Sequence, residues 1–183
     1  MKLQLPEGVT VDHTYQVTMT VTATETEDNS TQNSTFDFSV VVTNPNSIIV
    51  AKTGDDIIST GTTGNDTLIY NVLAAADAKA GHTGIDTWTD FHLGNPSSDT
   101  NADTIKFASD FFSGLTQAIL DTDNASTVGK FISVNSLNGK TTISIDRDGE
   151  TNGTNYQDLL ILTNQTTDVT LQDLLNNNQI IIG

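Results

Sequence analysis

Residues 61–69 read GTTGNDTLI, and residues 81–89 read GHTGIDTWT. The two stretches share a nine-residue pattern, with glycine at the first and fourth positions, aspartate at the sixth and a large apolar residue at the eighth. Residues 54–58, GDDII, repeat the part of this pattern that runs from the fourth position to the eighth. A short motif that recurs at this spacing indicates similar turns that stack on one another.

Each residue type in the pattern has a physical purpose. Glycine reaches the positive-φ conformations of a tight turn and exposes backbone carbonyl groups. Aspartate supplies a hard carboxylate oxygen, which Ca²⁺ prefers as a ligand. The apolar residue points inward and packs against its equivalents in neighbouring turns. The pattern therefore predicts the turns of a calcium-binding parallel β-roll.

The composition agrees with an acidic, cation-binding chain. The formal net charge is −16, from 23 acidic and 7 basic residues, and there is no cysteine. Such a chain repels nucleic acids and anionic lipid surfaces, and it repels itself unless cations are bound. No apolar run approaches the roughly 20 residues of a membrane span. We expect no nucleic-acid partner, no disulfide and no membrane insertion.

Residues 1–46 predict an amino-terminal pair of strands. Apolar residues alternate with polar ones from Tyr15 to Val21 and again from Phe36 to Val42, which is the period of half-buried strands. The polar residues 25–34 are predicted to join the strands as a long hairpin loop. Two or three strands bury too little apolar surface to stand alone. We interpret this piece as the terminal strands of an Ig-like or cadherin-like sandwich, an extender or linker region.

Residues 47–106 hold the glycine–aspartate turns. The alanine-rich residues 72–79 interrupt them and predict a helical turn. Two further aspartates, Asp90 and Asp103, follow the third turn. The run Asp103-Thr104-Ile105 repeats the aspartate and apolar positions of the pattern without the glycine.

Residues 107–183 predict a mixed α/β capping segment. Short helices are expected over 109–120 and 124–130, a buried strand over 158–162, a helix over 170–177, and a final apolar strand at 180–182. Thr170 and Asp173 have the spacing of a capping box for the 170–177 helix.

A hairpin is predicted within this segment at Asn138-Gly139, because this dipeptide favours the type I′ turn. Folding the chain about it places Val134 opposite Ile143, with the apolar residues of the two strands on one face.

The order of motifs resembles a known family. GNDTLIY at 64–70, GIDTWTDF at 84–91, NADTI at 101–105, ISIDRDG at 143–149 and DLLILTN at 158–164 follow one another. Residues 48–183 thereby resemble the carboxy-terminal repeats-in-toxin (RTX) domain of giant adhesins of Gram-negative bacteria, exported by type I secretion. The expected fold is mainly β: a short RTX-like calcium-binding roll with an α/β cap, preceded by Ig-like strands.

The resemblance implies a mechanism and a set of ligands. The uncleaved export signal lies at the carboxy terminus, the chain stays unfolded where Ca²⁺ is scarce, and Ca²⁺ outside the cell folds it. The implied carboxylate ligands are Asp56, Asp66 and Asp86, with Asp90 and Asp103 as further candidates. Backbone carbonyls complete the implied sites near the turn glycines Gly54, Gly61, Gly64, Gly81 and Gly84.

The resemblance also implies partners and a location. The partners are the ABC transporter, the membrane fusion protein and the outer-membrane channel of a type I secretion system. The protein is expected as a monomer, secreted to the surface of a Gram-negative bacterium, where such adhesins mediate cell adhesion and biofilm formation.

Other functional readings carry less weight. Asp146 and Asp148, in a DRDG run, match part of an EF-hand loop, but the twelfth position is Asn155 and not glutamate, so an acidic turn is an equal alternative. No nucleophile or phosphate-loop motif is present, and we expect no enzyme. The alternative function is a Ca²⁺-dependent carbohydrate- or ice-binding module. Trp88, at the apolar position of its turn, is predicted to lie in the core.

Overall fold

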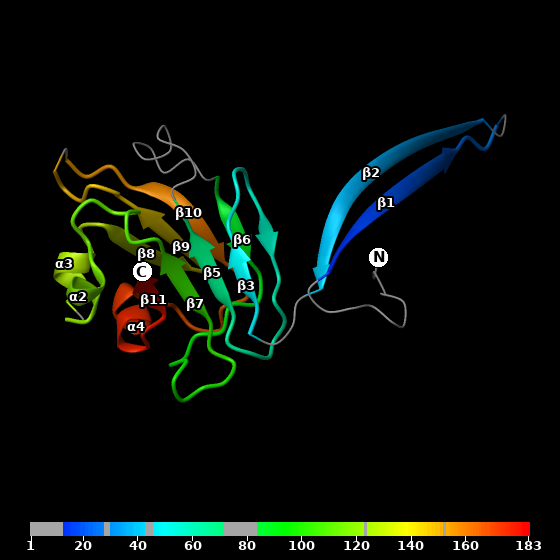
Figure 1. Ribbon diagram of the computed structural model, residues 1–183. Helices are drawn as coiled ribbons and strands as arrows, with labels where there is room; N and C mark the ends of the chain where they lie inside the picture. Colours follow the sequence, from blue (N-terminus) through cyan, green and yellow to red (C-terminus); the bar gives the residue numbers. More distant parts are fainter. Residues whose placement is uncertain (1–12, 28–29, 43–45, 72–83, 123, 152) are drawn as a thin grey trace. The chain divides into compact units, whose positions relative to one another are not determined.

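The computed structural model describes residues 13–27, 30–42, 46–71, 84–122, 124–151 and 153–183 (Figure 1). The chain divides into two compact units, Met1–Asn44 and Pro45–Gly183. The described residues are mainly β, as the sequence predicts. The predicted helical turn over 72–79 lies outside the described residues.

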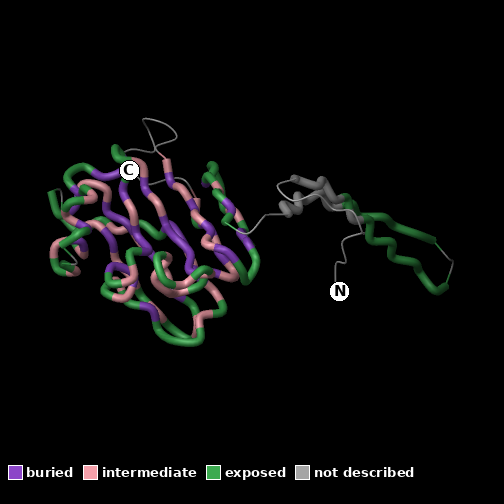
Figure 2. Tube along the Cα trace, turned by 60° about the horizontal axis from the view of Figure 1, so that its bottom comes forward, coloured by how far each residue is buried: buried purple, intermediate pink, exposed green. Residues whose placement is uncertain are grey.

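The amino-terminal unit contains an antiparallel hairpin of β1 (His13–Thr24) and β2 (Thr31–Val42). The predicted loop over 25–34 was too long, because Thr24 pairs with Thr31 and the loop closes with a bond from Glu25 N to Ser30 O of 2.8 Å. Near this turn both faces of the ribbon are exposed (Figure 2). Because neither face is buried there, the polar residues 31–34 form the start of β2 without the apolar alternation on which the prediction relied.

The second unit is built on two sheets, the first of them entirely parallel. From one edge to the other its strands are β3 (Ile48–Val50), β5 (Thr67–Tyr70), β7 (Thr104–Phe107) and β11 (Ile180–Ile182). Neighbours pair in register, so that Ile49, Leu68 and Ile105 stand side by side across three strands. Because parallel neighbours need long crossovers, the chain must leave this sheet between successive strands.

The second sheet receives those crossovers. Its order is β4 (Ile57–Ile58), β6 (Asp86–Trp88), β10 (Gln157–Leu162), β9 (Lys140–Ile145) and β8 (Ile132–Leu137). The first three strands are parallel, and β9 pairs antiparallel with both β10 and β8. The chain visits the two sheets in alternation from β3 to β7. We call each passage through one strand of the first sheet and one of the second a coil.

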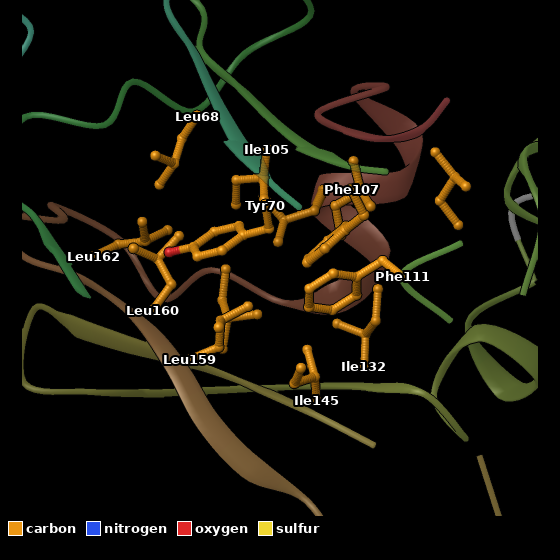
Figure 3. Packing of buried hydrophobic residues seen from close by; sticks show 14 of the residues in the cluster. Leu68, Tyr70, Ile105, Phe107, Phe111, Ile132, Ile145, Leu159, Leu160 and Leu162 are labelled. Atoms are coloured by element: carbon orange, nitrogen blue, oxygen red, sulfur yellow. The ribbon is translucent and has the colours of Figure 1, made fainter. Parts of the chain in front are cut away.

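The hydrophobic core joins residues of the two sheets. Leu68, Tyr70 and Phe107 of the first sheet belong to one buried cluster with Leu160 and Leu162 of the second (Figure 3). Trp88 is fully buried in the same cluster, which confirms its predicted place. The apolar position of each turn pattern thus supplies the core, as the sequence predicts.

Three short helices lie together at the end of this unit that carries β8 and β11 (Figure 1). They are α2 (Gln117–Leu120), α3 (Ala125–Val128) and α4 (Leu171–Asn176); α2 contacts β11 and α4 contacts β8. The prediction of a helix over 109–120 was wrong for its first part. Gly114 has a φ of 109°, which a right-handed helix does not allow, and Phe111 and Leu115 are instead buried in a turn.

The carboxy-terminal elements match their predicted positions. Thr170 caps α4 through a capping box with Asp173, and β11 forms the final strand, paired with β7. The buried strand predicted over 158–162 is β10, although its register shifts between Asp158 and Leu160.

The β8–β9 hairpin has the predicted register. Val134 pairs with Ile143 and Ile132 with Ile145. Asn138 and Gly139 have φ values of 53° and 75°, which are the two positive angles of a type I′ turn.

Replacing Gly139 by valine tests this turn. A β-branched residue at a φ of 75° is strained, and its Cβ would lie 3.1 Å from the carbonyl oxygen of Gln165. We expect Gly139→Val to lower the free energy of unfolding by about 1–3 kcal/mol in urea titrations. Asparagine also has a Cβ but tolerates positive φ, so Gly139→Asn should lower the free energy of unfolding clearly less than Gly139→Val. Equal losses would contradict a type I′ turn.

Candidate metal site

The first and third glycine–aspartate turns lie side by side. Strand β4 pairs with β6 in parallel, with Ile58 beside Trp88. Two hydrogen bonds extend this pairing into the turns: Ile85 N donates to Asp55 Oδ1 at 2.9 Å, and Asp56 N donates to Asp86 Oδ1 at 3.0 Å. Segments 30 residues apart in sequence therefore form one stacked pair of turns.

Glycine is required where these two turns meet. Gly54 and Gly84 have φ values of 100° and 98°. A Cβ on Gly84 would lie 2.1 Å from the carbonyl oxygen of Gly54, whereas a Cβ on Gly54 would meet nothing within 4 Å. Gly61 and Gly64 have φ values of 102° and 101°, as the turn pattern predicts, while Gly81 lies outside the described residues.

The second turn stacks between two other segments of the first sheet. Asp66 Oδ1 accepts a bond of 2.6 Å from Ser47 N on one side. On the other side Asp66 N donates to Asp103 Oδ1 at 3.0 Å. Each aspartate thereby bonds the backbone N–H of the preceding coil at the foot of a strand. Its side chain continues the parallel ladder beyond the last backbone pair.

Two asparagines outside the expected site extend the same ladder. Asn65 N donates to Asn46 Oδ1 at 2.7 Å, and Gly64 N donates to Asn101 Oδ1 at 3.3 Å. The sequence analysis missed both residues. Asn101 precedes Asp103 by two residues, as Gly64 precedes Asp66, so it occupies the glycine position of a fourth turn. The two-residue spacing between Asn101 and Asp103 could have identified Asn101 from the sequence.

Asp90 binds a different glycine turn. Its carboxylate accepts bonds from Ser59 Oγ at 2.7 Å, from Thr60 N at 3.1 Å and from Gly61 N at 2.8 Å. Three donors from one turn converge on this side chain. The structure thus places Asp90 beside the start of the second nonapeptide, and gives it a structural role there.

Three of the predicted ligand residues are deeply buried. Asp66, Asp86 and Asp103 are 1%, 0% and 2% exposed. Burial raises the pKa of Asp103 to about 7, and the nearby charges of Asp66 and Asp90 add to this, while N–H donors from His92 and Asp66 act in the opposite direction. The carboxylate of Asp103 is therefore costly to charge in the absence of a cation.

Asp86 differs from Asp103 in having a phenol as partner. Tyr70 Oη donates to Asp86 Oδ2 at 2.8 Å, and both residues are fully buried. Burial raises the pKa of Asp86, and burial together with this carboxylate raises that of Tyr70 well above its usual range. The two oxygens of Asp86 are thus occupied by Tyr70 and by Asp56 N.

One carboxylate oxygen in the ladder has no partner. Among buried side-chain atoms of the described residues, Asp66 Oδ2 stands out because nothing donates a hydrogen bond to it. A buried acceptor without a partner is destabilising unless water or a cation reaches it. This oxygen marks the point of the ladder that fits a cation best.

The remaining candidates are engaged elsewhere. Asp146 is buried, and its Oδ2 accepts a bond of 2.7 Å from Asn155 N, which closes the acidic loop that begins at the end of β9. Thr151 Oγ1 donates to the carbonyl oxygen of Asp148 at 2.8 Å. The loop is therefore ordered by its own hydrogen bonds.

The described residues nowhere bring together three or more histidine, aspartate or glutamate side chains in a position to hold a metal ion. A cation at Asp66 would thus need oxygen ligands from main-chain carbonyls or water in addition to carboxylates. Asp66 and Asp103 fit such a mixed ligand set, because they are adjacent and buried, and because Asp66 Oδ2 has no hydrogen-bond partner.

Comparisons of this chain with protein-family models, with curated proteins and with solved structures find no match. The resemblance to RTX domains therefore depends on the motifs and their spacing.

The contact between Gly54 and Gly84 generates a paired prediction. Gly84→Ala should lower the free energy of unfolding by about 2–5 kcal/mol, since it combines positive-φ strain with overlap onto a backbone carbonyl. Gly54→Ala has the same strain but an open Cβ position, and should cost about 1–2 kcal/mol. Denaturant titration measures both. A loss at Gly54 as large as that at Gly84 would show that the turns are not stacked.

The raised pKa of Asp103 predicts a pH dependence in chelator. Its pKa rises from 3.8 in the unfolded chain to about 7 in the folded one, so the folded state holds the proton more tightly. The free energy of unfolding should therefore fall as the pH rises from about 4 to about 7. Asp103→Asn, which cannot ionise, should flatten this slope in melting curves. Asp110→Asn, at an exposed position, is the control, and an equal flattening there would contradict the assignment.

Proposed function

We propose that this chain is a Ca²⁺-dependent folding and secretion module, of the kind that lies at the carboxy terminus of large bacterial adhesins. We also propose that residues 47–106 form a short parallel β-roll. Three findings support it: alternation of the chain between two sheets from β3 to β7 through strands that pair in parallel, positive φ at four turn glycines, and aspartates at equivalent positions of neighbouring coils.

The observation that carries the proposal is the pair Asp66 and Asp103. The two carboxylates are buried side by side in a ladder, one with an unpartnered oxygen and the other with a raised pKa. A divalent cation removes the mutual repulsion and satisfies the free oxygen. Ca²⁺ is the ion of choice, because it takes several oxygen ligands at flexible geometry.

In this proposal Asp66 and Asp103 bind the ion, and backbone carbonyls of the adjoining turns complete its shell. Asp86 and Asp90 hold neighbouring turns at the spacing that the site needs, because their carboxylates accept bonds from the backbone N–H groups of Asp56 and Gly61. The ion adds binding free energy to the folded state alone, since the unfolded chain has no preformed site.

Coupling between Ca²⁺ binding and folding favours export in one direction only. Where Ca²⁺ is scarce, the repulsion among 23 acidic residues and the cost of charging the buried carboxylates of Asp86 and Asp103 oppose folding, and the chain remains able to thread a channel. Outside the cell, Ca²⁺ folds the domain and prevents return. The partners in this proposal are the transporter, the fusion protein and the outer-membrane channel of a type I system. Within the described residues, no helix has the length and apolar character of a membrane span.

Calcium removal tests the proposal. Thermal melting followed by circular dichroism, with chelator and with Ca²⁺ in the millimolar range, should give a clearly higher Tm with the ion. Asp66→Asn should reduce this shift, because it replaces the unpartnered carboxylate with a neutral amide. Asp168→Asn, which removes an equal charge from an exposed position, should leave the shift intact.

Identical melting curves in chelator and in Ca²⁺ would refute calcium-dependent folding. A shift that survives Asp66→Asn would place the ion elsewhere. Asp99, which lies outside the turn pattern, is a less suitable control than Asp168, because its Oδ1 accepts a bond of 3.0 Å from the N–H of Asn101, and the Asn101 side chain is part of the ladder.

Export gives a separate test. Deleting residues 130–183 should abolish secretion through a type I system, as the resemblance implies for the carboxy terminus. Ile143→Asp buries a charge in the core and should prevent folding. It should nevertheless be exported, because the full carboxy terminus remains and export uses the unfolded chain. Secretion of the deleted form, measured in culture supernatants by immunoblot, would exclude the assignment.

A further inference from the structure

A shallow groove lies on the outer face of the antiparallel part of the second sheet, away from Asp66 and Asp103. It has a volume of about 640 Å³ and is lined by residues of β8, β9 and β10. Its floor consists of two cross-strand pairs with short polar side chains, Ser133 with Ser144 and Asn135 with Thr142. Since these side chains are short, the sheet is hollowed along its centre.

The rim of the groove is built from longer side chains. Leu137 and Lys140 form the next cross-strand pair, beside the turn, and Leu137 is 69% exposed. Asp158 lies on the β10 side, where its Oδ1 accepts a bond of 2.7 Å from Ser144 Oγ. No acidic side chain among the described residues forms a salt bridge with Lys140. The groove thus offers an ammonium group, a carboxylate, hydroxyl groups, an amide and one apolar surface.

The chemistry of this lining selects a neutral, polyhydroxylated ligand. The charges of Lys140 and Asp158 cancel, and a chain of net charge −16 repels polyanions. Hydroxyl, amide and carboxylate groups bond to sugar hydroxyls, both as donors and as acceptors. The exposed Leu137 side chain suits the apolar C–H face of a sugar ring, whose burial adds affinity.

We propose that this groove, on the outer face of β8, β9 and β10, binds a neutral oligosaccharide. This goes beyond the proposed secretion function, because it gives the folded domain a ligand outside the cell. It also differs from a calcium-mediated sugar site, because the sugar contacts only side chains of the groove.

The test is a titration of the full 183-residue chain, labelled with ¹⁵N and held in Ca²⁺ throughout. The probes are hexasaccharides of four neutral kinds, derived from cellulose, starch, mannan and chitin, and an alginate hexasaccharide as the polyanion. At least one neutral probe should bind with a Kd of about 1 mM or tighter, and shift backbone amides of residues 133–144 and 158.

Two variants and a control sharpen the result. Asn135→Ala and Thr142→Val each remove a polar group from the floor and should weaken binding about tenfold. Thr167→Val makes the same change at an exposed position outside the groove, and should bind as the unaltered chain does. The dispersed amide spectrum of each variant shows that it is folded.

Several outcomes would overturn the inference. These are absence of amide shifts with every neutral probe, binding of alginate alone, shifts located outside the groove, or full affinity in the two floor variants. None of them bears on the dependence of melting on Ca²⁺, so a failure of the sugar site is distinguishable from a failure of the proposed secretion function.

Discussion

The bond from a side-chain oxygen of one coil to a backbone N–H of the preceding coil is the constraint on which this fold depends. The strands of the parallel coils have only two to four residues, so their backbone ladders are short. Asp66, Asp86 and Asp103 lengthen these ladders at the foot of the strands, and Asn46 and Asn101 do the same for the turns. Without these bonds, the buried N–H groups of Ser47 and Asp66 would lose these acceptors, at a cost of about 1–3 kcal/mol for each group left unpaired.

The same bonds create an electrostatic problem. Stacking equivalent turns brings aspartates into register, and burial then raises the free energy of their charged forms. Backbone N–H donors offset part of this cost, as at Asp103, but the unpartnered Oδ2 of Asp66 receives no such donor. A structural role in the ladder and a role in cation binding are therefore compatible, since a carboxylate has two oxygens and each has more than one lone pair.

Much of this architecture could be predicted from the sequence, wherever local sequence preferences and tertiary packing favour the same structure. The register of the β8–β9 hairpin followed from Asn138-Gly139, and the α4 cap from Thr170 and Asp173. Prediction failed where long-range contacts decide. The helix expected over 109–120 forms only at 117–120, because residues 109–116 are instead ordered by aromatic packing around Gly114. The sequence left open which turns stack on each other; the first pairs with the third because the chain alternates between the two sheets. Asn101 was missed because it replaces glycine in the pattern.

The two ends of the sheets are unlike, and this gives the domain a polarity. The helices close the end that carries β8 and β11, while β3 and β4 are the edge strands at the opposite end among the described residues, with Ile48 and Ile57 72% and 82% exposed. Each additional coil before β3 would add one strand to each sheet and cover these side chains, without altering the core behind them. Gain or loss of whole turns would therefore change the length of the two sheets at one end only, while the helices keep the other end closed.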